Sequence, residues 1–354
     1  MTSTTETKHL NKSVNYFQPE FSHIYIEEEA LKWDRTEEAL SSFPSAERIP
    51  ITDYKQIFNR PNQNIFSQHN SKKLILAIKK EPFLYRGSDI LQDTQYQNIY
   101  YTTPLINCIY HCDYCFLHGM YPSANLVAFV NDSDFYNAVD EAIMVRKFKS
   151  QPLLLSIAYN NDLLAFENKV SYCKNWIEYA KNKNNLLIEI RTKCANVNSI
   201  KEITSNPNIL FAWTLTPNEV RRRYEKFTPS LEKRLDALEI LISKGWKVRI
   251  CVDPVLYVND WESIYNSLFD KLFSRIKHEQ ISDMVIGVFR MNKNYFNRIR
   301  AQKPNSGLYY QNWDQSDNII ESSESVQSVM YDKIEEMINK YIPLEKVYFW
   351  KNAS

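Results

Sequence analysis

The feature that most constrains the fold is a regular alternation of strand-like and helix-like segments between residues 97 and 290. Short runs of β-branched, aliphatic and aromatic residues predict strands at 98–103, 153–159, 186–193, 209–216, 246–252 and 284–290. Apolar residues at helical spacing predict helices at 134–148, 163–182, 196–204, 229–244 and 261–276. Strands that alternate with helices form a parallel sheet with right-handed crossovers. Six such units are fewer than the eight of a closed barrel, so we expect an α/β protein built on an open six-unit (βα)6 partial TIM barrel.

Shorter patterns flank this barrel on both sides. The helix predicted at 229–244 has the clearest ends, with Thr228 as its N-cap and Gly245 just beyond its last turn. Further strands are predicted at 24–26, 48–51, 74–79 and 347–350, and further helices at 35–42 and 325–341. We therefore expect an N-terminal accessory α/β domain over 1–95, the barrel over 96–290 and a C-terminal extension over 291–354.

Composition excludes several classes of function. The chain of 354 residues holds only 5 glycines, all far apart, so neither a G-x-G-x-x-G fingerprint nor a P-loop can form. A net charge of +1 gives no overall field for nucleic acid, so such a site would have to be a local basic patch. The sequence shows neither a signal peptide nor an apolar run that could span a bilayer, and a cytoplasmic protein is expected.

The strongest chemical signal is the spacing Cys108-x-x-x-Cys112-x-x-Cys115, which follows the first predicted barrel strand. Loops at the carboxyl ends of barrel strands build active sites, and three thiolates so close together can hold one metal centre. One interpretation is zinc, with His111 or His118 as a fourth ligand. However, there is no second cysteine pair, and three cysteines without a fourth ligand suit a 4Fe-4S cluster with one open iron.

The segment C-x-x-x-C-x-aromatic-C, here with Tyr114 as the aromatic residue, resembles the signature of radical S-adenosylmethionine enzymes. The resemblance implies that the open iron chelates the amino and carboxylate groups of S-adenosyl-L-methionine, with Tyr114 near its adenine. Reductive cleavage of this cofactor then gives a 5′-deoxyadenosyl radical. The partial barrel is also the fold of that superfamily.

More of the chain resembles the spore photoproduct lyase family in particular. The stretches that carry the resemblance are 108–117, 190–193, 213–216, 228–235 and 253–262. Members of that family split the methylene-bridged thymine dimer of ultraviolet-damaged DNA. The adenosyl radical removes a hydrogen atom from C6 of the lesion, the bridge breaks, and a hydrogen atom returns to the product. The resemblance thus implies a radical carbon–carbon lyase that acts in DNA repair.

The sequence departs from the family where that hydrogen atom is returned. The family's donor cysteine aligns at or beside Tyr159, and the tyrosine that usually follows the third cluster cysteine is Phe116. Tyr114, Tyr159 and Cys251 are the catalytic candidates, because a phenol or a thiol can give up a hydrogen atom. Cys251 shares strand parity with Asp253, so both can face the barrel mouth.

Cofactor contacts are expected from polar residues at the ends of the barrel strands. Lys193 can meet the carboxylate of S-adenosylmethionine as a point charge. Thr214 and Thr216 share one face of their strand, and Ser156 and Asn160 are further candidates. The family's glycine-rich place after the second strand reads Ala158–Tyr159–Asn160 here.

DNA contact is expected from basic residues that alternate with aromatic ones in the stretch 284–313, with a second basic cluster near residue 221. The predicted DNA-contacting residues are Arg221, Arg222, Arg290, Lys293, Arg298, Arg300 and Lys303. A flavodoxin or ferredoxin is the expected electron donor, and a monomer is expected. Two alternatives stay open: a related radical enzyme acting on another DNA lesion or nucleoside, and a non-enzymatic protein that binds zinc or nucleic acid.

Overall fold

The computed structural model describes residues 16–87 and 96–350. Its larger sheet has eight strands in the order β18-β14-β13-β11-β10-β9-β5-β4. The six barrel strands are β5 (Asn98–Thr102), β9 (Leu153–Ser156), β10 (Leu186–Thr192), β11 (Ile209–Thr214), β13 (Lys247–Val255) and β14 (Asp283–Val288). All six pair in parallel and follow one another across the sheet in chain order, which confirms the open six-unit partial barrel. The edge strands are β4 (Leu84–Arg86), which is antiparallel to β5, and β18 (Val347–Phe349), which is parallel to β14.

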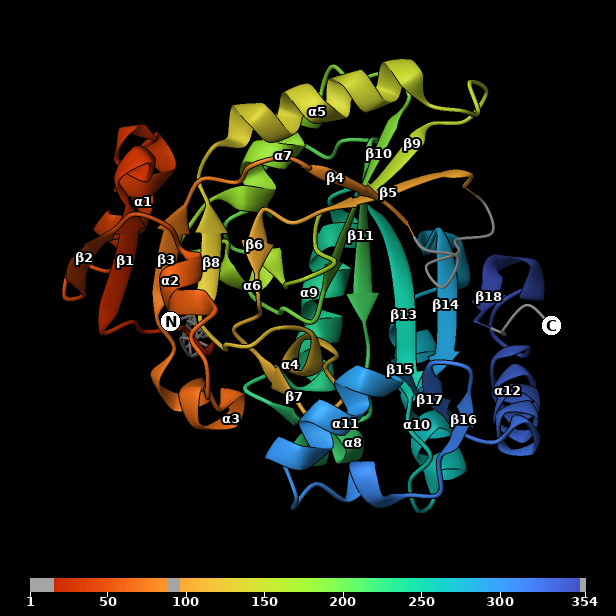
Figure 1. The fold of residues 1–354 in the computed structure, drawn as a ribbon. Coiled ribbons are helices and arrows are strands. Elements are labelled where there is room, and N and C mark those ends of the chain that lie inside the picture. The colour runs from red at the N-terminus through yellow and green to blue at the C-terminus, as the bar shows by residue number, and fades with distance from the viewer. Residues whose placement is uncertain (1–15, 88–95, 351–354) are drawn as a thin grey trace, which may run out of the picture.

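Helices cover the outer face of this curved sheet (Figure 1). The longer ones are α5 (Asp132–Val145), α7 (Tyr172–Ala180), α9 (Leu231–Ser243), α10 (Trp261–Arg275) and α12 (Glu324–Ile338). Strands covered by such crossovers lose contact with water, and every residue of β11 and β14 is buried. Their uninterrupted apolar runs in the sequence have this cause.

Two predicted helices differ from the structure. The segment 163–182 holds two helices, α6 (Leu163–Phe166) and α7, because the buried carboxylate of Glu167 accepts the backbone N–H groups of Cys173 and Lys174 and starts a second helix. The segment 196–204 forms turns, since the Asn196 side chain accepts the N–H of Asn198 and competes with helical bonding.

The predicted cap of the helix at 229–244 is also wrong. Helix α9 begins at Leu231, and Ser230 caps it by accepting the backbone N–H of Lys233. Thr228 instead directs its hydroxyl at the backbone and side chain of Glu225. Gly245 follows the end of α9 with a φ of 81°, in the left-handed region that a residue at this place requires.

A second sheet of five strands, in the order β2-β1-β3-β8-β6, lies beside the barrel (Figure 1). Its strands are β1 (His23–Glu27), β2 (Glu47–Ile51), β3 (Leu74–Ala77), β6 (Leu105–Ile106) and β8 (Leu126–Phe129), and α1 (Asp34–Ser42) connects β1 to β2. Since β6 and β8 come from beyond residue 95, this sheet takes strands from both sides of the predicted boundary. The divisions at 95 and 290 stay predictions.

The segment after β14 folds back over the barrel mouth. It forms β15 (Arg290–Asn292), α11 (Lys293–Gln302), β16 (Asp314–Ser316) and β17 (Ile319–Glu321). Helix α11 packs against the short helix α4 (Leu117–Met120) so closely that a Cβ on Gly119 would lie 2.5 Å from the Cα of Tyr295. Among the described residues, we find no helix with the length and apolar character that a membrane span requires.

Candidate active site

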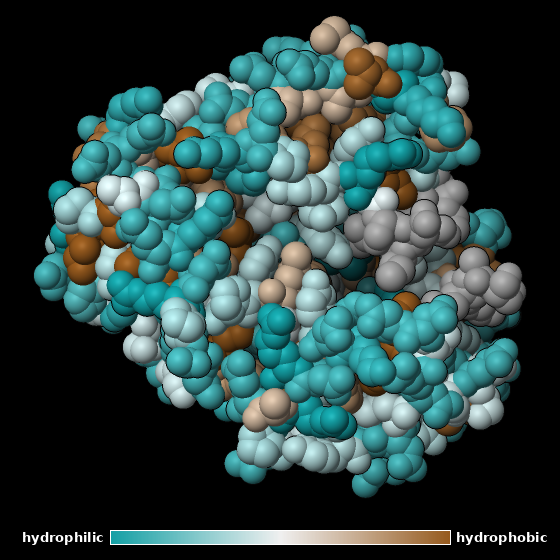
Figure 2. Space-filling model, viewed as in Figure 1, coloured by the Kyte–Doolittle hydropathy of each residue, from teal (hydrophilic) through white to brown (hydrophobic). Residues whose placement is uncertain are grey.

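A cavity of about 850 Å³ opens at the carboxyl ends of the barrel strands. Side chains from successive strands line it, among them Tyr101, Ser156, Lys193, Thr214 and Asp253. The space-filling view shows the molecule hollowed near the centre of this face, above α11 (Figure 2). The geometry agrees with the expectation that the strand ends build the site.

The three cysteines of the predicted cluster loop line this cavity together. Cys108 and Cys115 are half-buried, Cys112 is buried, and all three are free thiols. Burial, with the nearby charge of Asp162, raises the pKa of Cys108 to about 12, so a bound cation is what would favour its thiolate form. Three thiols that line one cavity fit an iron–sulfur cluster.

The histidines proposed as zinc ligands of this loop lie elsewhere. His111 and His118 group with His69, with one ring nitrogen of each within 4.8 Å of the others. In the described part of the chain no cysteine belongs to that group. The structure therefore does not support a mixed cysteine–histidine zinc site at the loop.

Contacts from distant segments hold the cluster loop in place. Lys72 donates to the carbonyl oxygens of Cys108 at 2.6 Å and of Ile109 at 3.3 Å. Strand β7 (His111–Cys112) pairs with β12 (Glu225–Lys226) in antiparallel fashion. On the other side, the loop residue Asp113 forms an ion pair with Lys303, and its carbonyl oxygen accepts the hydroxyl of Tyr309 at 2.5 Å.

A buried carboxylate, Glu225, organises the floor of the site and was missed by the sequence reasoning. It forms an ion pair with Arg234, accepts the Tyr114 hydroxyl, and lies 3.7 Å from the Nζ of Lys193. Burial alone would raise the pKa of Glu225, but Arg234 and Lys193 outweigh this and hold the pKa at about 2. A sequence signal for this carboxylate was available in Arg234. Arg234 lies on the same helix face as Leu231 and Leu238, which predicts a buried positive charge paired with an acidic residue.

Two predicted cofactor residues are engaged with this carboxylate. The ammonium of Lys193 lies 4.9 Å from the ring centre of Tyr114 as well as near Glu225. Thr216 donates its hydroxyl to Glu225 at 2.8 Å, and it is not among the described residues that line the cavity. Thr214 and Ser156 do line it. Their roles as cofactor contacts stay predictions.

The loop after β9 carries two polar oxygens without partners. Asn160 donates to the hydroxyl of Thr103 at 3.0 Å, and Asn161 donates to the carbonyl oxygen of Leu105 at 2.8 Å. The Oδ1 atoms of both asparagines are buried and have no hydrogen-bond partner among the described residues. Asn161 lines the cavity, whereas Asn160 is not among the described residues that line it. Since a buried acceptor without a donor is costly, the oxygen of Asn161 fits a site that a cationic amino group would complete.

The candidate hydrogen donors differ in their access to the cavity. Tyr159 lines it, with its ring 4.5 Å from that of Tyr101 and 5.6 Å from that of Phe116, measured between centres. Cys251 is fully buried in a cluster with Ala212 and Val285, and it is not among the described lining residues. Cys251 is therefore closed off from the cavity in this structure, and its role as a hydrogen donor stays a prediction.

A charged network forms part of the cavity wall, where Glu189, Arg191, Arg249 and Asp253 line it. Arg249 bonds to Glu189 at 2.9 Å and to Asp283 at 2.5 Å, and Arg191 lies 3.6 Å from Asp253. Each buried charge faces an opposite one, which is how buried charges are tolerated.

The predicted DNA-contacting residues are dispersed in the structure. Arg290 lies 3.4 Å from Asp253 in the cavity wall, Lys303 pairs with Asp113, and Arg298 donates to the carbonyl oxygen of Gly119. Arg298 and Arg300 are exposed on α11, where Lys293 is half-buried. Arg222 is exposed and pairs with Glu219 at 3.4 Å.

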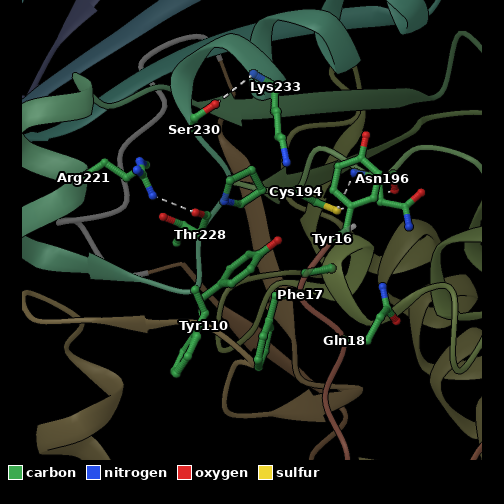
Figure 3. A pocket seen from close by; sticks show the side chains of 13 residues that line it. Tyr16, Phe17, Gln18, Tyr110, Cys194, Asn196, Arg221, Thr228, Ser230 and Lys233 are labelled. Carbon is green, nitrogen blue, oxygen red and sulfur yellow. Dashed lines mark hydrogen bonds between the residues drawn. The ribbon is translucent and has the colours of Figure 1, made fainter. Parts of the chain in front are cut away.

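Arg221 lines a separate, smaller cavity of about 350 Å³ together with Tyr16, Cys194 and Lys233. Figure 3 shows its guanidinium directed at the carbonyl of Thr228, to which it donates at 3.2 Å. A DNA-contacting role for these basic residues stays a prediction.

Comparison with known proteins identifies the family. A family model described as spore photoproduct lyase matches residues 17–349. The spore photoproduct lyase of Bacillus subtilis (strain 168) is 22% identical over 276 residues, 76% of this chain and 77% of that protein. That of Geobacillus sp. (strain Y412MC61) is 22% identical over 267 residues, 74% and 75% of the two chains.

Solved structures show the same fold. A spore photoproduct lyase complexed with dinucleoside spore photoproduct matches with a TM-score of 0.80 at 18% identity, over 94% of this chain and 98% of that one. A mutant spore photoproduct lyase with bound AdoMet and dinucleoside spore photoproduct also gives 0.80, at 17% identity over 94% and 98% of the two chains. Because the family model spans nearly the whole described chain, this protein belongs to the spore photoproduct lyase family.

Proposed function

We propose that this protein is a radical S-adenosylmethionine lyase that splits a methylene-bridged thymine dimer in DNA. One observation carries the proposal. The three cysteines of the loop, the cation of Lys193 and the phenol of Tyr159 line one cavity at the carboxyl ends of the barrel strands. Family membership supports the same conclusion.

Residues of the cavity fit both a 4Fe-4S cluster and S-adenosylmethionine. Cys108, Cys112 and Cys115 would hold the 4Fe-4S cluster, and the unpartnered oxygen of Asn161, with that of Asn160 next to it in the sequence, would accept the amino group of S-adenosylmethionine. When bound, the two cofactors together supply a carbon radical that can take a hydrogen atom from the substrate.

Tyr159 is the proposed source of the hydrogen atom that returns to the product. Burial, with the neighbouring Tyr101 and Tyr295, raises the pKa of Tyr159, so its phenol keeps its hydrogen at neutral pH. The Glu225 carboxylate already accepts the hydroxyl of Tyr114, which is therefore less free to act. Phe116 beside Tyr159 has no O–H to contribute.

DNA would approach over α11, where Arg298 and Arg300 are exposed. A dimer inside a duplex must be extruded to reach the cavity, at a cost of about a few kcal/mol that is smaller for damaged bases. A small iron–sulfur or flavin protein would supply the electron to the monomeric enzyme.

The test is lesion reversal under anaerobic conditions. Reconstituted protein with S-adenosylmethionine and dithionite should convert each dinucleoside spore photoproduct to two thymidine molecules, measured by chromatography. Cys112→Ala should abolish both the brown colour and the reversal, whereas Cys173→Ala, in the buried helix α7, should retain both. If the cofactor is cleaved but no lesion reverts, the lyase proposal fails and a related substrate takes its place. The altered residues at 116 and 159 favour that second candidate.

The donor is tested by isotope transfer. In deuterated water the exchangeable hydrogen of Tyr159 becomes deuterium, so the product of the normal protein should carry one deuterium. Tyr159→Phe should remove this label, and Cys251→Ala should leave it in place. Equal labelling from both variants would exclude Tyr159.

A further inference from the structure

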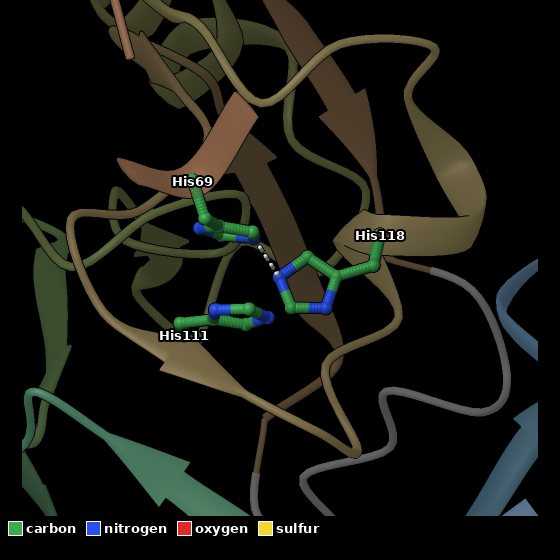
Figure 4. Close-up of side chains that lie close together, drawn as sticks. All are labelled: His69, His111 and His118. Atoms are coloured by element: carbon green, nitrogen blue, oxygen red, sulfur yellow. Dashed lines mark hydrogen bonds between the residues drawn. The ribbon is translucent and has the colours of Figure 1, made fainter. Parts of the chain in front are cut away.

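Three buried histidines meet behind the cluster loop, outside the set of residues that line the active-site cavity. His69 belongs to the short 3-10 helix 69–71, His111 to β7 and His118 to α4, so the three come from separate elements. Figure 4 shows their rings facing one another. Their exposed fractions are 9%, 5% and 6%.

The ring nitrogens of this cluster are poorly satisfied. Nε2 of His69 and Nε2 of His118 lie 3.2 Å apart, and the rings of His69 and His111 stack with centres 3.4 Å apart. The Nδ1 atoms of His69 and His118 and the Nε2 of His111 have no hydrogen-bond partner among the described residues. A buried polar atom left in this state costs about 1–3 kcal/mol, and a ligand bound at Nε2 of His111 would remove one such cost.

The surroundings of the three rings are apolar on one side and charged on the other. The charge of Lys303 is offset by its ion pair with Asp113, and Phe66 covers His111 and His118 with ring centres 5.4 Å away.

We propose that His69, His111 and His118 form a binding site for one divalent transition-metal ion of the zinc type, distinct from the cysteine loop. One ring nitrogen of each histidine lies within 4.8 Å of the other two. Zinc–nitrogen bonds of about 2.0–2.1 Å at tetrahedral angles place two ligand nitrogens about 3.3 Å apart. The hydrogen-bond distance of 3.2 Å between Nε2 of His69 and Nε2 of His118 is already at this spacing, so the ion would replace that bond. The rings of His69 and His111 stack within 8° of parallel, so one of them would rotate to direct its nitrogen at the same ion. A water molecule would complete the four ligands.

Such an ion would brace the loop that carries the cysteines. His111 directly precedes Cys112, and His118 follows Cys115 by three residues, while His69 belongs to a segment far away in the sequence. A metal that joins them would fix both ends of the loop against the smaller sheet. Its role is structural, so it requires no electron and no change of oxidation state.

The test measures metal content in the full chain, purified anaerobically with its iron–sulfur cluster. After incubation with Zn²⁺ and removal of loosely bound ions, the protein should retain about one zinc per chain in addition to iron. Zinc-edge absorption spectroscopy should show nitrogen ligands and no sulfur at the zinc. Less than a fifth of an equivalent, or sulfur at the zinc, would overturn the proposal.

Variants locate the ion. His69 is outside the cysteine loop, so the His69→Gln variant should lose at least 90% of the zinc and keep its iron. His278 is half-buried elsewhere in the fold, and the His278→Gln control should keep both metals. If His69→Gln does not fold, Co²⁺ added to a chain with all three loop cysteines changed to serine provides the second measurement. Visible bands of four-coordinate cobalt support the site, and their absence overturns it. Because lesion reversal is measured separately, failure here leaves the proposed lyase activity standing.

Discussion

Replacing Glu225 with glutamine removes the buried negative charge beneath the proposed active site. The side chains of Glu225 and Arg234 are both 0% exposed, so the change leaves a guanidinium buried without its counter-charge. Breaking such a pair from one side costs about 3–5 kcal/mol. The pKa of Glu225 gives an independent figure, since a fall from 4.5 to about 2 on folding corresponds to about 3 kcal/mol at neutral pH. We expect Glu225→Gln to lower the free energy of unfolding by about 3 kcal/mol.

The effect should depend on pH with a definite sign. The pKa of Glu225 is lower in the folded chain than in the unfolded one, so its stabilisation is complete above pH 4.5 and is lost as the pH falls toward 2. Urea unfolding of the cluster-free chain, followed by tryptophan fluorescence, measures both proteins. The difference between them should shrink to about 1 kcal/mol at pH 3. Glu232→Gln, at an exposed site, serves as the control. A difference below about 1 kcal/mol at pH 7, or one that does not change with pH, would refute the reasoning.

Two further predictions concern packing and DNA. Gly119→Ala places a Cβ 2.5 Å from the Cα of Tyr295 and should cost about 1–3 kcal/mol, seen as a lower melting temperature. In Gly307→Ala the added Cβ would lie 3.4 Å from the nearest atom, so the melting temperature should change little. Arg300→Ala should weaken DNA binding and reduce the slope of log K against log salt by about one, whereas Lys333→Ala on α12 should not. An unchanged slope for Arg300→Ala would show that Arg300 on α11 does not contact DNA phosphates.

Periodicity predicted the barrel, because its strands are short runs rich in β-branched, aliphatic and aromatic residues that alternate with helical patterns. The strand predicted at 209–216 is observed as Ile209–Thr214, so its predicted start is exact and its predicted end differs by two residues. Where side chains compete for backbone hydrogen bonds, the same reasoning failed. Glu167 divides one predicted helix, and Asn196 prevents another, through contacts that no apolar pattern records.

The site was predictable only in part for a related reason. Spacing along the chain placed three cysteines on one loop, and the structure gathers them at one cavity. Some contacts of Glu225 and of the histidine cluster join residues far apart in the sequence, such as Tyr114 and Glu225 at a separation of 111 and His69 and His118 at 49. No local pattern encodes such pairs, although Arg234 on an apolar helix face was a usable sign.

The long-range contacts explain how a chain with so few glycines can hold its three-cysteine loop in place. The loop carries no glycine between its cysteines, and its shape depends on side chains that reach it from elsewhere. Lys72 binds its start, β12 pairs with its centre, and Lys303 and Tyr309 hold Asp113 from the C-terminal segment. Each of these segments belongs to a different part of the fold, so the cysteines converge only when the whole chain has folded. Cluster binding should therefore stabilise the entire chain against unfolding, because a ligand that binds the folded form alone shifts the equilibrium toward it.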